Sequence, residues 1–176
     1  GKMLMASKTC VVLENSPFSM YNPAIKEAVK QFWTITPYEF IDIEEFNKRR
    51  IDPAYSFIVL LETDYEKDKT GATFAFVNLI LGMKVKNLEE MPEFCAIPID
   101  FAGEDADGDY AYKLGMIVRF IQQHAQVVMD NPKNPGVRHL KYYNNLVSDV
   151  ASKTILAREE DMEATLKSPE EISELY

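Results

Sequence analysis

Three apolar runs along the chain each end directly in a carboxylate, and these side chains are the first candidates for chemistry. The run VVLE ends at Glu14, VLLE ends at Glu62 and IPID ends at Asp100. Carboxylate oxygens are the ligands that Mg²⁺ and Ca²⁺ prefer, and grouped carboxylates can also supply a general acid. The pattern therefore predicts a divalent cation site at Glu14, Glu62 and Asp100 if the strands bring them together. The alternative is that each is a solvated strand end, because a strand leaving the core needs a polar residue.

The segment SPFSMYNP, after the first apolar run, is the second candidate. It offers Phe18, Met20 and Tyr21 as apolar or stacking surface and Asn22 as a polar anchor, a combination that is typical of ligand sites. It lacks the glycines of a phosphate-binding loop. We therefore predict ligand binding by Phe18, Met20, Tyr21 and Asn22. The alternative is a packed loop whose aromatic side chains hold the first helix.

Side chains suited to nucleophilic catalysis form no motif. The chain has no Gly-x-Ser-x-Gly elbow, and its histidines, His124 and His139, belong to no metal or triad pattern. Cys10 and Cys95 sit inside apolar runs, where thiols behave as small hydrophobes. These observations favour a protein that is not an enzyme, with structural or surface histidines and buried cysteines.

The elements that must position these side chains alternate in the first half of the chain. Apolar, β-branched runs predict strands over 8–13, 38–41 and 55–61. Asn22, with Pro23 as the first helical residue, predicts a helix to Trp33, and Asp42 predicts a second helix to about Arg50. A strand-helix-strand-helix-strand order predicts parallel strands joined by crossovers. The carboxylates after the first and third strands would then share one edge of the sheet.

The second half has a different pattern. Strands over 72–85 and 94–99 follow without an intervening helix, so they predict an antiparallel meander, and Pro98 predicts an edge strand or a strand end. A long apolar stripe predicts a helix over 109–130. Asn134 predicts the cap of another helix, 153–157 a further strand and Ser168 a helix start. We predict one α/β (or α+β) domain over 1–176, with a mixed sheet of five or six strands and helices covering its faces.

Composition narrows the function classes. The net charge of −9 argues against a domain that neutralises nucleic-acid phosphates, and no apolar run is long enough for a membrane span. The chain starts with Gly1-Lys2, and a lone leading glycine is typical of protease cleavage. This start favours an exported protein that has lost its signal, or a piece of a longer native chain; Met3 as the true start is the competing interpretation.

Three functions remain from the residues alone. The leading prediction is a non-enzymatic binding or interaction module for a protein or small-molecule partner. The alternative is a metal-assisted hydrolase or phosphotransfer enzyme that uses the carboxylates at the strand ends. The third is a subunit of a homo-oligomer, with the long fourth strand or the late helices at the interface.

Overall fold

The computed structural model describes residues 1–64, 69, 71–102, 110–131 and 143–154. The chain divides into two units, Gly1–Asn134 and Pro135–Tyr176. The sheet and its covering helices all belong to the first unit. In the second unit, a 3₁₀ segment spans Val147–Ser152, while the helix predicted after Asn134 and the start predicted at Ser168 lie outside the described residues, as does most of the strand predicted over 153–157.

The first unit is built on a five-stranded mixed sheet with the order β2-β1-β3-β4-β5. Its strands are β1 (Lys8–Val12), β2 (Tyr38–Ile41), β3 (Tyr55–Asp64), β4 (Thr73–Leu81) and β5 (Glu93–Ala102). β1 is parallel to both β2 and β3, whereas β3, β4 and β5 are antiparallel neighbours. The predicted parallel half and antiparallel meander are therefore confirmed. β5 is an edge strand of this sheet, as Pro98 predicted.

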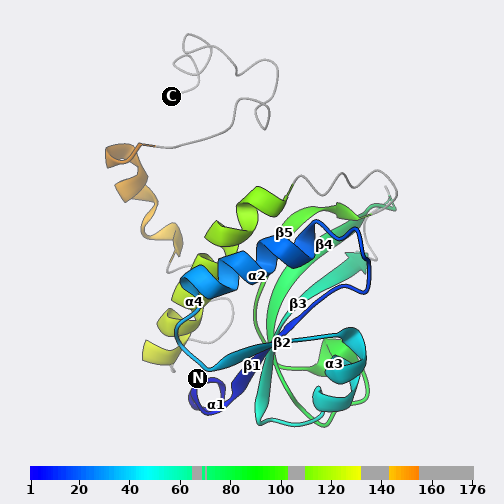
Figure 1. The fold of residues 1–176 in the computed structure, drawn as a ribbon. Coiled ribbons are helices and arrows are strands. Elements are labelled where there is room, and N and C mark those ends of the chain that lie inside the picture. The colour runs from blue at the N-terminus through cyan, green and yellow to red at the C-terminus, as the bar shows by residue number, and fades with distance from the viewer. Residues whose placement is uncertain (65–68, 70, 103–109, 132–142, 155–176) are drawn as a thin grey trace. The chain divides into compact units, whose positions relative to one another are not determined.

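Helices cover both faces of the sheet (Figure 1). On one face, α2 (Tyr21–Phe32) and α4 (Leu114–Asp130) pack together over a core that includes Val11, Ile58 and Val77. On the other face, α3 (Ile43–Arg49) covers a smaller core around Phe46 and Phe57. The 3₁₀ turn η1 (Leu88–Glu90) comes directly before Met91, a further residue of this core. A short helix, α1 (Lys2–Ala6), precedes β1. The two crossover helices that connect the parallel strands, α2 and α3, therefore lie on opposite faces of the sheet.

Two element ends differ from the predictions. α2 begins at Tyr21 rather than after Asn22, because the Ser19 hydroxyl accepts a hydrogen bond from the Asn22 N–H and caps the first turn. Asn22 is therefore a helical residue. β3 does not end at Glu62 but continues to Asp64, because residues up to Asp64 pair with β4.

Two further boundaries were also misplaced. β4 stops at Leu81 rather than at residue 85. The next residue is Gly82, where a Cβ would lie 2.0 Å from the Asp52 carbonyl oxygen, so this close approach requires glycine. The long helix predicted over 109–130 begins as a 3₁₀ turn, η2 (Ala111–Lys113), before α4.

A chain of hydrogen bonds joins four buried hydroxyls near the amino end of β1. Its members, in order, are Thr36, Thr9, Ser56 and Ser7, with oxygen separations of 2.5, 2.8 and 2.9 Å. The Trp33 indole N–H donates to Thr36 at 2.9 Å, and the Leu4 carbonyl oxygen lies 2.7 Å from the Ser7 hydroxyl. The Trp33 N–H can only donate and the Leu4 carbonyl can only accept. Each hydroxyl therefore donates its single hydrogen bond to the next oxygen in the direction of Leu4. Each of these four buried hydroxyls thereby has hydrogen-bond partners within the described structure.

No helix within the described part of the chain is both long and apolar enough to cross a membrane.

Candidate functional site

A crevice opens where β1 ends beside the middle of β3, on the carboxyl side of these two parallel strands. The chain leaves β1 through α2 to one side of the sheet, then crosses back through α3 to reach β3 on the other side of β1. The strand order therefore reverses between β1 and β3. In open α/β sheets, ligands bind outside the carboxyl ends of the strands at this point of reversal.

The crevice is small and mostly apolar. Its volume is about 180 Å³, and its lining residues come from the end of β1 and the residues after it, from the middle of β3 and from the start of α3. They are Val12, Leu13, Glu14, Asn15, Ile43, Val59 and Leu60. Glu14 is the charged member of this set. Apolar walls with few polar groups are the usual composition of a small-molecule site.

Glu14 is held in place by the first turn of α2. Its backbone N–H donates to Asn22 Oδ1 at 2.9 Å, and Asn22 Nδ2 donates to its carbonyl oxygen at 2.8 Å. The Ser19 hydroxyl donates to Glu14 Oε2 at 2.5 Å. These contacts order the residue that directly follows β1 and aim one carboxylate oxygen at Ser19. Among the described residues, the other oxygen, Oε1, has no hydrogen-bond or ionic partner.

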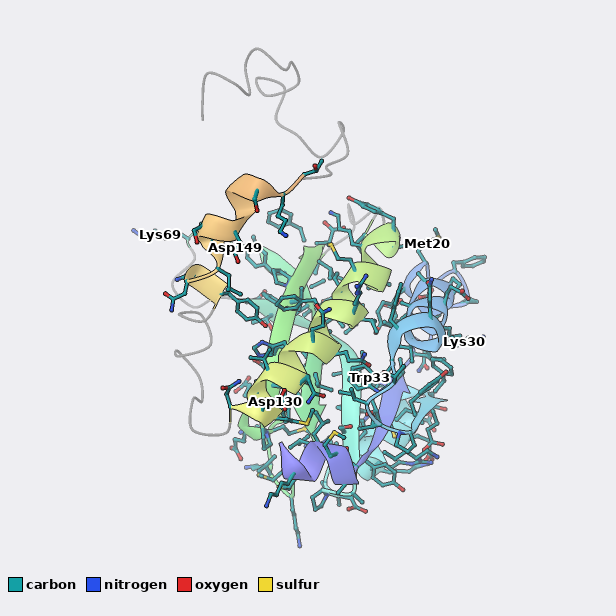
Figure 2. The ribbon with its side chains drawn as sticks, turned by 90° about the vertical axis from the view of Figure 1, so that its left-hand side faces the viewer. Met20, Lys30, Trp33, Lys69, Asp130 and Asp149 are labelled. Atoms are coloured by element: carbon teal, nitrogen blue, oxygen red, sulfur yellow. The ribbon has the colours of Figure 1, made fainter. Side chains whose placement is uncertain are left out.

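The predicted binding loop divides into an exposed and a buried part. Phe18 is 89% exposed and Met20 is 58% exposed, and Figure 2 shows Met20 near the first turns of α4, with Asp130 at the other end of that helix. Tyr21, in contrast, is completely buried in the core, and Asn22 acts on the Glu14 backbone. Phe18 and Met20 are thus the members of the predicted set that can reach a ligand directly.

The Tyr21 hydroxyl is buried without a hydrogen-bond partner in the described part of the chain. Burial, and then the nearby negative charge of Glu14, raise the pKa of Tyr21 far above its ordinary value. Tyr110, after β5, has its pKa raised by burial, by Glu14 and by Asp100. Glu14 and Asp100 therefore act on the same tyrosine at this edge.

The three carboxylates predicted to hold a cation reach one edge of the sheet but not a common point. Glu62 and Asp100 both pair with Ala75 of β4, which therefore separates them by one strand. Asp100 Oδ1 accepts a hydrogen bond from the Phe101 N–H at 2.8 Å. In the described residues, no group of three His, Cys, Asp or Glu side chains is arranged to hold a metal ion. Cation binding by Glu14, Glu62 and Asp100 stays a prediction.

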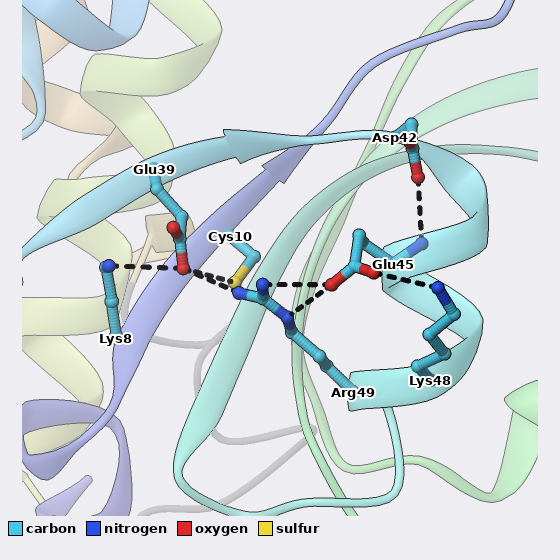
Figure 3. A network of polar contacts seen from close by, with 7 residues as sticks. All are labelled: Lys8, Cys10, Glu39, Asp42, Glu45, Lys48 and Arg49. Atoms are coloured by element: carbon cyan, nitrogen blue, oxygen red, sulfur yellow. Dashed lines mark hydrogen bonds and ion pairs between the residues drawn. The ribbon is translucent and has the colours of Figure 1, made fainter.

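A second polar cluster joins α3 to the two strands beside it (Figure 3). Arg49 contacts Glu39 Oε1 at 2.7 Å and Glu45 Oε2 at 2.9 Å, and Lys8 contacts Glu39 at 3.1 Å. Asp42 begins the helix as predicted, since its Oδ1 accepts from the Glu45 N–H at 2.8 Å. The carboxylates here have cationic partners, so this cluster fastens α3 to β2 and β1.

The thiols are suited to packing rather than to nucleophilic attack. Burial, with a smaller contribution from Glu39, raises the pKa of Cys10 to about 11. Burial and Glu93 raise the pKa of Cys95 to about 12. Both cysteines are free, and they pack against opposite faces of the sheet. Thiolates are therefore scarce at neutral pH, and the thiolate is the reactive form.

His124 has a structural place, as predicted. It is buried on α4, where Nε2 lies 3.1 Å from the Phe94 carbonyl oxygen and the ring stacks on Phe120. This contact joins α4 to β5. His139 lies outside the described residues.

Sequence reasoning missed the residues that shape the crevice beside Glu14. Ile43 opens α3 and Asn15 follows Glu14, and neither type suggests chemistry by itself. The available signal was position, because Asn15 follows the carboxylate at the end of the first predicted strand and Ile43 follows the predicted helix cap Asp42. Strand order is needed to recognise that these positions meet, and strand order depends on long-range pairing.

No protein-family model matches the chain, and no significant match was found among curated proteins or solved structures. Function is therefore argued from the site itself.

Proposed function

We propose that this chain is a binding module that takes up an apolar group of its ligand in the crevice between the end of β1 and the middle of β3. The observation that carries the proposal is the position of the crevice between β1 and β3. The strand order reverses there, and the crossover helices α2 and α3 lie on opposite faces of the sheet. Because the connections that follow neighbouring strands leave in opposite directions at such a point, the backbone leaves space for a ligand between them. The proposal requires no catalytic group, and it names the crevice as the recognition site.

The size of the crevice indicates how much of a ligand it takes. Whole small-molecule sites measure roughly 300–1,000 Å³, whereas this crevice has about 180 Å³. A dry cavity of roughly 150 Å³ is large enough for benzene. The crevice therefore suits one side chain or one end of a larger ligand. The rest of that ligand would lie on the surface of the same edge.

Exposed apolar side chains supply surface beyond the crevice. Phe18 and Met20 project from the loop between β1 and α2, which begins at the crevice. Ile43, in the crevice wall, is 37% exposed. Exposed apolar side chains that gather beside a concave site mark contact surfaces for partners. They support an interaction module over an enzyme that encloses its substrate.

A titration with n-butanol tests the proposal by amide chemical shifts of ¹⁵N-labelled protein. This probe is neutral and small enough to enter the crevice. We expect millimolar binding with shifts concentrated at Val12, Leu13, Asn15, Ile43 and Val59. Shifts that are absent, or that centre on the amino end of the sheet around Lys8, would contradict the proposal.

A further inference from the structure

We propose that the crevice receives the side chain of a lysine that a basic segment of a partner protein presents. This inference rests on the proposed function, since it names the chemistry of the group that enters the crevice. It depends on three features of the carboxyl edge: the apolar walls, the unpaired oxygen of Glu14 and the exposed side chains beside them.

The walls of the crevice fit an aliphatic chain with a charge at one end. Val12, at the end of β1, and Val59 and Leu60, in the middle of β3, form apolar walls, and Glu14 lines the same crevice. A lysine buries its four methylenes along apolar surface and keeps its ammonium in water. A ligand with an apolar stem and a terminal cation therefore matches both parts of the crevice.

Charge complementarity selects a cation over an anion or a neutral group. The ion pairs among the described residues all use Glu39 or Glu45. Glu14, Glu62 and Asp100, at the carboxyl edge, have no such partner within the described chain. The protein thus neutralises carboxylates beside α3 and leaves those at the crevice edge negative, on a chain of net charge −9.

The hydrogen bond from Ser19 favours lysine over arginine. It occupies Glu14 Oε2 at 2.5 Å, so Oε1 is the oxygen left to accept from a ligand. Arginine gains its advantage from a bidentate fork that contacts both carboxylate oxygens. Lysine carries a compact ammonium that needs a single acceptor. The geometry of Glu14 is suited to the single contact.

The exposed loop argues that the lysine belongs to a polypeptide rather than to a free amine. Phe18 is 89% exposed and Met20 is 58% exposed, and a free alkylamine in the crevice would leave both uncovered. Residues on either side of a lysine in an extended segment could cover them. The occupant is therefore a segment that combines a lysine with apolar neighbours.

A series of blocked pentapeptides tests the inference. Each has leucine on both sides of a central lysine, arginine, norleucine or glutamate, and binding is followed by amide shifts of the ¹⁵N-labelled protein. We expect the lysine peptide to bind about fivefold more tightly than the norleucine peptide, as suits a partly exposed ion pair. That advantage should fall toward unity between about 0.05 M and 0.5 M salt. The glutamate peptide should bind most weakly.

A pair of charge-matched variants locates the contact. Glu14→Gln should make the lysine and norleucine peptides bind equally, whereas Glu62→Gln, which removes the same charge outside the crevice lining, should keep the preference. Equal binding of these two peptides to the unaltered protein would overturn the inference and leave the proposed function standing. Tighter binding of the arginine peptide would overturn the choice of lysine. If none of the peptides and no n-butanol shifts the crevice amides, the proposed function fails as well.

Discussion

The side-chain amide of Asn22 pairs with both backbone groups of Glu14. Its Oδ1 accepts from the Glu14 N–H at 2.9 Å, and its Nδ2 donates to the Glu14 carbonyl at 2.8 Å. A neighbouring strand would satisfy the backbone in the same way, so the first turn of α2 replaces a strand partner just after β1 ends. The crevice carboxylate is therefore placed by a helix residue eight positions later.

We expect Asn22→Ala to lower the free energy of unfolding by about 1–2 kcal/mol, because two hydrogen bonds are lost. The variant should also weaken n-butanol binding, since Glu14 and Asn15 would lose their fixed position. Urea denaturation and amide shift titration measure the two effects. Gln31→Ala, an exposed change near the end of the same helix, is the control and should alter neither. Unchanged n-butanol affinity in a destabilised Asn22→Ala protein would show that this pairing does not shape the crevice.

Removal of the Tyr21 hydroxyl should not harm the fold. This hydroxyl is buried without a hydrogen-bond partner in the described structure, and an unsatisfied buried polar group costs about 1–3 kcal/mol. We expect Tyr21→Phe to unfold at the same urea concentration as the unaltered protein or at a higher one. A loss of more than about 1 kcal/mol would mean that the hydroxyl is bonded in solution.

The buried hydroxyl chain should be sensitive at each link. Thr9→Val keeps the shape of the side chain but leaves Thr36 without an acceptor and Ser56 without a donor. We expect a loss of about 1–3 kcal/mol in the free energy of unfolding. Thr63→Val, at an exposed threonine of β3, should be nearly neutral. A double-mutant cycle with Ser56→Ala should show coupling between the two positions, and strictly additive losses would contradict the chain.

Glu39 should make stability depend on pH in the acid range. Partial burial disfavours its charge, but hydrogen bonds and charges from Lys8 and Arg49 prevail and hold the pKa of Glu39 below its ordinary value. Such a group adds stability above its unfolded pKa and loses it as the pH falls through the folded pKa. The stability advantage of the unaltered protein over Glu39→Gln should therefore be constant near neutral pH and shrink below roughly pH 4.

Urea denaturation across the acid range measures this difference. In an Arg49→Met background, where Glu39 has lost one partner, the pH-dependent part should be smaller. A difference between the two proteins that stays level from neutral to acid pH would rule out a stabilising charge on Glu39.

Local sequence signals were sufficient for the sheet but not for the crevice. The strand over 38–41, the Asp42 cap and the direction of every strand followed from apolar periodicity and connection type. The order β2-β1-β3 did not, because it depends on which strand pairs with β1 across the chain. Without that order, Glu14, Glu62 and Asp100 could be grouped only by their positions at strand ends, and Val59 and Ile43 were seen only as apolar residues.

The helix start shows the same limit on a smaller scale. Asn-Pro predicted a cap at Asn22, yet the side chain of that residue bonds to Glu14, eight residues earlier in the chain, and the Ser19 hydroxyl accepts from the Asn22 N–H instead. A tertiary contact here overrides a local preference. Tyr21 was likewise assigned to a ligand and belongs to the core, since the side a residue faces depends on where the helix begins.

Crevice occupancy is tested most directly by comparing n-butanol titrations of Ile43→Trp and Ile51→Trp. Both isoleucines are partly exposed, at 37% and 47%, but only Ile43 lines the crevice. We expect Ile43→Trp to abolish the shifts at Val12, Leu13 and Asn15 while keeping its unfolding midpoint, and Ile51→Trp to bind like the unaltered protein. Undiminished binding to a folded Ile43→Trp protein would place the site elsewhere and contradict the account.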